Sequence, residues 1–315
     1  MRQIKVHKSS FFKRAILLFW ELYVNFRFVK YEDFFEYEER NDFRYTKMRA
    51  EVSLGYKINL EDPKTFNEKL IARRLFSRSP VWAKVTDKNK VRQWLVENGY
   101  LEKILLVPAV KCVSLDDLLK YKVTHPVVIK AAWASGRNVF VSNQKELLDN
   151  MKLFKKWLDE PYKVSTLIWA STQNPRSFIV EDKLSLKNGN VPVDYKFFVF
   201  NGRVSFIQVD VDRFSEHTRA LFDRGGNRLP YSYCSYETTT SDYHLPEYVT
   251  SRMIDVAEKL GAKFSFIRVD LYWFDGKVFF GELTQTPSAG FGRLSSIDFD
   301  MELGEAWRDF DKYGM

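Results

Sequence analysis

The sequence predicts an α+β protein built from helices and antiparallel hairpins. Asn201-Gly202 separates two strand-like runs, and this dipeptide is the strongest short-range signal for a hairpin turn. Asp275-Gly276 separates a second pair of such runs. The four runs are 195–200, 203–211, 266–274 and 277–283. Because the helical segments do not alternate regularly with single strands, a parallel βαβ sheet is not expected.

The composition is typical of a packed globular protein with a basic surface. Hydrophobic residues make up 45% of the 315 positions and aromatic residues 16%, and a disordered chain would be short of both. Lysine and arginine exceed aspartate and glutamate by 49 − 41 = +8, which favours anionic partners such as nucleotides, acidic glycans or anionic lipid. The sequence has no helix-turn-helix, zinc-finger or RNP-type pattern, so we expect no nucleic acid partner.

Cysteine and histidine do not indicate a metal centre. Cys112 and Cys234 lie far apart and outside any CxxC motif, so neither a disulfide framework nor a zinc site is expected, and a reducing cytoplasm fits. The four histidines never fall at a ligand spacing such as HExxH. A metal ion would therefore have to bind to carboxylates.

An amphipathic first helix is expected near the N-terminus. Its large apolar residues recur at three- and four-residue steps, namely Phe12, Ile16, Phe19, Tyr23 and Phe26. Charged residues interrupt the stretch, and it has no small-residue cleavage site, so we expect neither a membrane span nor a signal peptide. Two interpretations stay open: a helix that packs on the core, or a peripheral helix that rests on the inner face of the membrane. The charge-dense stretch 31–49 is expected to be a solvated connector.

The middle of the chain has clear helix and strand signals. Thr65 with Glu68 predicts a capping box for a helix that runs to Leu75, and Thr86 or Asp87 is expected to cap the next helix. Further on, the runs 127–130 and 139–141 form a predicted hairpin, a helix covers about 146–158, and 178–180 is a short strand.

The candidate chemistry lies in the last hairpin. Asp270 and Glu282 stand in its two facing arms, so their carboxylates are expected to be cross-strand neighbours on one face. Like charges in that position destabilise a sheet unless they are compensated, and Mg²⁺ is commonly held by one or two carboxylates plus substrate phosphates. Arg268 shares the strand face of Asp270 and could meet phosphate or neutralise transition-state charge. The alternatives are an exposed strand carboxylate and a simple arginine–carboxylate salt bridge.

At this point the sequence resembles a known family. Arg268-Val269-Asp270-Leu271-Tyr272, Gly281-Glu282-Leu283-Thr284 and Thr286-Pro287 with Gly290 are similar to the metal-binding end of ATP-grasp enzymes, most closely of the TupA-like, teichuronopeptide-biosynthesis type. Further matching elements occur in the family's order from about residue 60 onward, namely Asp87-Lys88, Val91-Arg92, Lys130, Ser135-Gly136, Glu181, Asp194 to Phe198, Asn201-Gly202 and Asp210 to Arg213.

The resemblance implies a role for each matched residue in binding ATP and Mg²⁺. For the nucleotide, it implies that Lys130 contacts the α- and β-phosphates, that the Ser135-Gly136 loop contacts phosphate, and that Glu181 contacts adenine and ribose. For the reaction, it implies that Lys196 contacts the transferred phosphate, that Asp194 has an orienting role, and that Arg213 and Arg268 supply catalytic charge. It also implies that Asp270 and Glu282 bind the metal. The chain departs from the family pattern in the phosphate loop, where it has Ala132-Trp133-Ala134 and Arg137 in place of Asn-His-Gly and a glycine. Thr284 stands where many members place a metal-binding asparagine.

The resemblance also implies the fold and the activity. The expected fold has two α+β subdomains that enclose the nucleotide, after an α-rich N-terminal region. The expected divisions are 1–50 for an amphipathic helical extension, 51–125 for an α-rich lead-in, 126–190 for the first subdomain and 191–315 for the second, with the metal site. The expected activity is a carboxylate-amine ligase that joins an amino acid or similar amine to an acidic sugar of a bacterial surface polysaccharide. The alternatives are a polysaccharide phosphotransferase and a catalytically silent binding protein.

Overall fold

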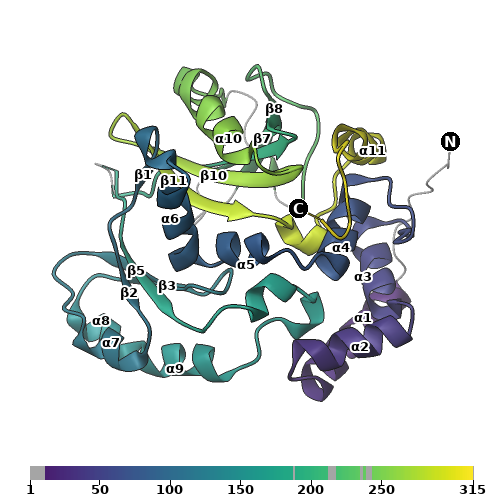
Figure 1. The fold of residues 1–315 in the computed structure, drawn as a ribbon, viewed down its shortest axis with the longest axis horizontal. Helices are drawn as coiled ribbons and strands as arrows, with labels where there is room; N and C mark the ends of the chain where they lie inside the picture. The colour runs from purple at the N-terminus through teal and green to yellow at the C-terminus, as the bar shows by residue number, and fades with distance from the viewer. Residues whose placement is uncertain (1–10, 187–188, 212–217, 235–236, 239–242, 315) are drawn as a thin grey trace.

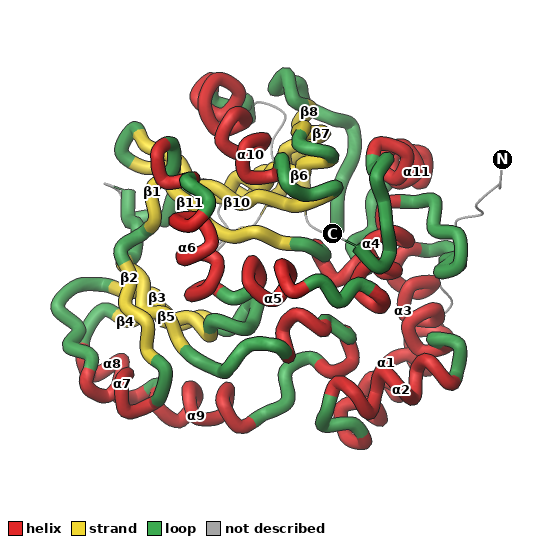
Figure 2. The backbone as a smooth tube through the Cα atoms, in the orientation of Figure 1, coloured by secondary structure: helices red, strands yellow, loops and turns green. Residues whose placement is uncertain are grey.

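The computed structural model describes residues 11–186, 189–211, 218–234, 237–238 and 243–314. These residues form two sheets with helices packed around them (Figures 1 and 2). The larger sheet has the strand order β1-β11-β10-β6-β7-β8-β9, and the smaller one has the order β2-β5-β3-β4. The larger sheet consists of β1 (Leu105–Leu106), β6 (Asp194–Phe200), β7 (Arg203–Val211), β8 (Thr218–Asp223), β9 (Glu237–Thr238), β10 (Phe266–Phe274) and β11 (Lys277–Thr284). The smaller sheet consists of β2 (Ala109–Cys112), β3 (Val127–Ala131), β4 (Asn138–Val141) and β5 (Phe178–Asp182).

The helices lie before, between and after the strands. They are α1 (Phe11–Arg27), α2 (Tyr31–Arg40), α3 (Arg44–Leu54), α4 (Phe66–Phe76), α5 (Pro80–Thr86), α6 (Lys88–Glu97), α7 (Leu115–Lys120), α8 (Gln144–Asp149), α9 (Met151–Asp159), α10 (Ile254–Gly261) and α11 (Ile297–Ala306). The predicted caps are present: Thr65 and Glu68 form the capping box of α4, and Asp87 caps α6. The helix expected over 146–158 is divided at Asn150 into α8 and α9.

The two faces of the larger sheet have different partners. On one face, Phe197 and Ile267 join the core with Trp82 of α5, Leu95 of α6 and Ala257 of α10. The opposite face buries Phe198, Phe206 and Phe266 in a second cluster with Phe66 of α4 and Phe299 of α11. Successive strand residues alternate between faces, so both hairpins predicted from sequence bury apolar side chains on both sides.

The second face changes from apolar to polar along the strands. On β10, Phe266 is followed on the same face by Arg268 and Asp270, and on β6 Phe198 is preceded on that face by Lys196. Helices α4 and α11 cover the aromatic end. The polar end is left to line a cavity.

The smaller sheet also has one apolar and one polar face. Ile129 and Phe178 pack on one side with Phe154 and Trp157 of α9. Lys130 occupies the other face of β3, next to Glu181 on β5. Each sheet therefore has a charged surface that lines the same cavity.

The segment 31–49 is not the solvated connector expected from its charge. It folds into α2 and the first part of α3, and Phe34 and Tyr45 are fully buried in a cluster with Val24 of α1. Buried Glu38 accepts hydrogen bonds from the backbone N–H groups of Tyr45 and Thr46, at 3.0 and 2.8 Å. Apolar residues at helical spacing thus outweigh the charges, most of which lie on the exposed sides of the helices.

Candidate functional site

Asp270 is the centre of a polar row across the larger sheet. Glu282 of β11 lies opposite it on one side, and Lys196 of β6 lies opposite it on the other. The pairing is the one predicted from sequence for the two carboxylates, and directly opposed residues point to one face of a sheet. Asp270 is 2% exposed, whereas the Glu282 side chain is 41% exposed.

A β-bulge brings these two carboxylates into register. Leu271 pairs with Phe280, but the preceding residue Asp270 pairs with Glu282, which leaves Gly281 as the extra residue. A Cβ atom at position 281 would lie 2.9 Å from the carbonyl oxygen of Asp270. The bulge in this form therefore requires glycine.

Arg268 binds both carboxylates. Its Nε and Nη2 donate to the two carboxylate oxygens of Asp270 at 2.7 and 2.6 Å, and Nη2 also donates to Oε1 of Glu282 at 2.8 Å. The Thr284 hydroxyl donates to the same Glu282 oxygen at 2.9 Å. Burial alone would raise the pKa of Glu282, but Arg268, Lys88 and Lys196 with this hydrogen bond lower it to about 2. The Glu282 carboxylate is therefore ionised at neutral pH.

These residues fit a divalent cation that brings part of its own ligand shell. Among the described residues no group of three or more histidine, cysteine, aspartate or glutamate side chains is placed to hold a metal. Mg²⁺ does not need such a group, because it usually keeps water and binds one or two carboxylates together with substrate phosphates. Thr284, at the position where an asparagine ligand would be expected, uses its hydroxyl on Glu282. Metal binding by Asp270 and Glu282 stays a prediction.

Lys196 is held in a buried group of three aspartates. Its Nζ donates to Asp194 and lies 3.4 Å from Asp210 and 3.6 Å from Asp270. Burial by itself lowers the pKa of Lys196, but Asp194 and Asp270 more than offset this, so the net shift is upward and the side chain is charged. Asp210 is also bound by Arg219 Nε at 2.6 Å. The prediction that Asp194 and Lys196 share a strand face is confirmed by this contact.

The smaller sheet contributes a second charged pair. Lys130 forms an ion pair with Glu181, and Arg92 Nη1 of α6 lies 3.5 Å from the same carboxylate. Lys130 and Glu181 line a cavity of about 1170 Å³, which Lys196 and Asp270 line from the opposite sheet. The two sets of residues predicted to bind the nucleotide therefore lie around one space.

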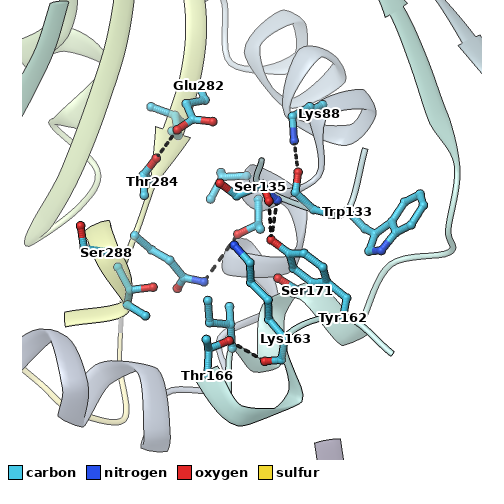
Figure 3. A pocket seen from close by; sticks show the side chains of 18 of the residues that line it. Lys88, Trp133, Ser135, Tyr162, Lys163, Thr166, Ser171, Glu282, Thr284 and Ser288 are labelled. Carbon is cyan, nitrogen blue, oxygen red and sulfur yellow. Dashed lines mark hydrogen bonds between the residues drawn. The ribbon is translucent and has the colours of Figure 1, made fainter. Parts of the chain in front are cut away.

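The predicted phosphate loop is fixed by a tyrosine that the sequence did not reveal. The Ser135 N–H donates to the Tyr162 hydroxyl at 2.7 Å, and that hydroxyl donates to the Ser135 carbonyl at 2.8 Å (Figure 3). Gly136 has φ +77°, and a Cβ there would meet nothing within 4 Å. Glycine is thus favoured at this position by the backbone conformation and not by close approach of a neighbour.

A second cavity has a volume of about 820 Å³, and Figure 3 shows side chains that line it. Lys88, Lys163, Arg268, Glu282 and Ser288 line both cavities. The smaller cavity alone is also lined by residues of the N-terminal region, namely Glu21 and Asn25 of α1, Phe28 of the following loop and Arg49 of α3. The metal-site prediction thus coincides with the place where two cavities meet.

Lys88 is a site residue that sequence reasoning left without a role. Its Nζ donates to the carbonyl oxygens of Ala134 and Ala131, at 2.5 and 3.2 Å, below the predicted phosphate loop. Burial lowers its pKa, while Glu282 opposes that shift. In the sequence, its position directly after the helix cap Asp87, in the stretch that resembles the family, was the one feature that could have indicated a role for Lys88.

Arg213, predicted as catalytic, lies outside the described residues.

Comparison with known proteins gives one family match and several distant structural likenesses. A family model described as TupA-like ATP-grasp matches residues 68–308, well over half of the chain. No curated protein matches the chain by sequence. Among solved structures, D-alanine–D-alanine ligase from Bacillus anthracis is 17% identical, with 64% of this chain and 57% of that chain covered and a TM-score of 0.40.

Two further structures are similar at the same level. The ADP complex of purK, an N5-carboxyaminoimidazole ribonucleotide synthetase, is 12% identical over 65% of this chain and 45% of that one, with a TM-score of 0.42. The ATP-grasp ligase PsnB, in complex with a phosphomimetic variant of its minimal precursor, Mg and ADP, is 11% identical over 73% and 60%, with a TM-score of 0.41. The chain spans about half of the length of the solved structures it matches.

Proposed function

This chain belongs to the TupA-like ATP-grasp family, and we propose that it is an ATP-dependent carboxylate-amine ligase acting on an acidic sugar of a bacterial surface polysaccharide. The family and the α+β fold predicted from sequence are confirmed by the match and by the two sheets. The reaction, the acceptor sugar and the amine, an amino acid or a similar compound, are the proposal.

One observation supports the ligase chemistry above all: the cavity lined by the predicted nucleotide residues meets a second cavity at Arg268, Glu282 and Lys88. A ligase of this kind needs the γ-phosphate of ATP and a second substrate at one point. The larger cavity suits the nucleotide, because Lys130 and Lys196 line it. The smaller cavity, which the N-terminal helices complete, suits the carboxylate acceptor and the amine.

The proposed reaction has two balanced steps. A carboxylate oxygen of the acceptor attacks the γ-phosphorus, and the bond from that phosphorus to the β–γ bridging oxygen breaks to release ADP. The amine nitrogen then attacks the acyl carbon, inorganic phosphate leaves, and the nitrogen loses one proton as the amide forms. Each step moves negative charge, so fixed cations are the main contribution that the protein can make.

The position of each residue suggests its part in this reaction. We propose that Lys130 and the Ser135-Gly136 loop hold phosphate, that Glu181 contacts adenine and ribose, and that Asp194 orients Lys196 toward the transferred phosphate. Arg268 neutralises charge where the cavities meet, and we assign Arg213 the same role. A Mg²⁺ ion held by Asp270 and Glu282 would supply further charge neutralisation.

Product analysis tests the proposal. With Mg-ATP, an oligogalacturonate as acceptor and an amino acid as amine, we expect release of ADP and phosphate only when both substrates are present, and an amide product by mass spectrometry. A phosphorylated glycan without amide would replace the ligase with a phosphotransferase. Absence of an ATP-induced rise in melting temperature would favour a silent binding protein, since a ligand that binds only the folded state must stabilise it.

The substrates also suggest where the protein works. ATP is supplied in the cytoplasm, and we propose that the protein acts there, at the inner face of the membrane where surface polysaccharides are assembled. Among the described residues no helix is both long and apolar enough to cross a bilayer.

A further inference from the structure

We propose that one face of α1 docks the protein on the surface of an anionic membrane. Five large apolar side chains of this region are exposed, with exposed fractions of 62% for Leu18, 69% for Phe19, 72% for Leu22, 89% for Phe26 and 63% for Val29. Single exposed apolar residues are ordinary on protein surfaces, but a contiguous group marks an interaction site.

The exposed residues form one face because of helical spacing. Leu18, Leu22 and Phe26 are four residues apart, so their side chains lie in a row along the helix, with Phe19 beside it. The opposite side of the helix is fixed by the core, where Val24 is fully buried and Leu17 and Trp20 pack against the same cluster. Rotation of α1 cannot hide the exposed row without removing Val24 from that core. The core-packing interpretation of the helix therefore applies to one face, and our proposal assigns the peripheral interpretation to the other.

The charges around this face match an anionic surface. The segment 11–30 contains Lys13 and Arg14 at the start of α1, Arg27 and Lys30 at its end, and Glu21 as its one acid, a net charge of 4 − 1 = +3. Lys13 is paired with Glu51 of α3 at 2.6 Å, so we assign the contact with anionic lipid to Arg27 and Lys30. Apolar and aromatic residues flanked by basic ones are the composition of helices that lie in the membrane interface. Acidic residues of α2 would be repelled by anionic lipid, so the contact is confined to α1; they are Glu32, Asp33, Glu36 and Glu39.

Docking through this face would bring a cavity to the membrane. Glu21 and Asn25 line the smaller cavity, and Asn25 lies three residues after Leu22 on the neighbouring row of the helix. The cavity edge and the apolar face are therefore adjacent on α1. If the proposed function holds, the acceptor polysaccharide is taken up at the bilayer surface. Membrane docking itself does not depend on that function.

Vesicle co-sedimentation tests the docking. We expect the full-length protein to bind vesicles of phosphatidylcholine and phosphatidylglycerol in equal parts, and to bind pure phosphatidylcholine vesicles weakly. Leu22→Ser with Phe26→Ser should lower the affinity for the anionic vesicles by about tenfold or more. The reason is that burial of each large apolar side chain in the membrane raises the binding constant by roughly tenfold. Both side chains are exposed, so the melting temperature of this double variant should match that of the parent.

A matched control uses exposed leucines elsewhere. Leu119→Ser with Leu148→Ser changes side chains that are 48% and 50% exposed on α7 and α8, and we expect vesicle binding to be retained. Equal loss of binding in both double variants would overturn the proposal, because it would show a non-specific effect of apolar surface. The proposal would also fail if deletion of residues 2–10 alone abolished binding.

Light scattering distinguishes membrane docking from dimerisation of the chain through the same face. A parent dimer that becomes monomeric in the Leu22→Ser, Phe26→Ser variant, with no vesicle binding by the parent, would identify the face as a dimer interface and overturn the proposal. A monomeric parent that binds anionic vesicles supports it. The ATP-induced thermal shift of the same double variant should equal that of the parent, so a failure of docking is distinguishable from a failure of nucleotide binding.

Discussion

Asp270 lies directly opposite Glu282 although the two residues are not equally distant from the turn that joins their strands. Asp270 precedes the Asp275-Gly276 turn by fewer residues than Glu282 follows it. The bulge accommodates Gly281 as the extra residue of β11, so that Asp270 pairs with Glu282. Arg268 links the two residues by donating hydrogen bonds to both carboxylates. The geometry of the candidate metal site thus depends on a backbone irregularity.

Replacement of the bulge glycine should damage both stability and metal-dependent binding. In Gly281→Ala the new Cβ would lie 2.9 Å from the Asp270 carbonyl and 3.1 Å from the Tyr272 ring, so the strands must shift. We expect a loss of about 1–3 kcal/mol in the free energy of unfolding and a smaller Mg²⁺-dependent thermal shift with ATP. Gly276→Asn, in the distant turn, is the control and should keep the thermal shift. Parent-like behaviour of Gly281→Ala in both measurements would contradict the proposed role of the bulge.

Removal of the Glu282 carboxylate should separate metal binding from nucleotide binding. We expect Glu282→Ala to abolish the part of the ATP-induced thermal shift that requires Mg²⁺, while a residual shift with ATP alone persists through Lys130 and Lys196. Thr284→Val removes the hydroxyl that donates to Glu282 and should weaken the Mg²⁺ effect without abolishing it. An unchanged Mg²⁺ effect in Glu282→Ala would show that the metal is held elsewhere.

Lys196 should be essential for folding stability because of the acids around it. Lys196→Met would remove the ammonium group that binds Asp194 and lies within 4 Å of Asp210 and Asp270, and breaking a buried ion pair from one side costs roughly 3–5 kcal/mol. The double variant Lys196→Met with Asp194→Asn should recover part of that loss, since it also removes one of the buried negative charges. Chemical denaturation of the parent, the two single variants and the double variant gives the coupling. Additive effects would mean that the two residues do not act as a pair.

The hydroxyl of Tyr162 should restrain the phosphate loop. Tyr162→Phe removes both hydrogen bonds to Ser135, which should cost about 1 kcal/mol of stability and free the Ser135 N–H. If that N–H is needed for phosphate, ATP should bind more tightly to the variant, as measured by calorimetry. Weaker ATP binding would indicate that the tyrosine contact belongs to the nucleotide-bound state. Tyr121→Phe is a control tyrosine change outside both cavities.

The buried carboxyl of Asp300 should give the stability of the protein a distinctive pH dependence. Burial raises its pKa from 3.8 to about 6, although Tyr56 and Asn67 donate hydrogen bonds to it. The folded state therefore holds this proton more tightly than the unfolded state. Its contribution to stability is complete below about pH 4 and is lost as the pH rises through about 6, a change of about 3 kcal/mol.

The Asp300→Asn variant isolates that contribution. The difference in unfolding free energy between the parent and Asp300→Asn should change in favour of the variant as the pH rises from about 4 to about 7. Urea denaturation at several pH values measures this difference. A difference that is constant over the range would show that Asp300 does not titrate with a raised pKa.

Local patterns in the sequence were sufficient for most of the secondary structure and for the candidate chemistry. The two hairpins, the cap of α4 at Thr65 and the cap of α6 at Asp87 depend on residues close to each other in the chain. The sequence places Asp270 and Glu282 in the facing arms of one short hairpin, although their direct opposition also requires the bulge at Gly281. The common face of Asp194 and Lys196 follows from the alternation of side chains along one strand. The ordered motifs also identified the family, which the match over 68–308 confirms.

Contacts between distant segments decided the rest. Charge density suggested a solvated connector over 31–49, but burial of Phe34 and Tyr45 against α1 makes it helical, and such burial depends on a partner that local composition does not specify. The Tyr162 contact with Ser135, the group of aspartates around Lys196 and the two faces of α1 also require segments that meet only in the folded chain. The sequence alone therefore determined which residues carry charge and on which strand they lie. The tertiary structure decided which of these charges face each other, because burial and Coulomb interaction depend on distance in space and not on separation along the chain.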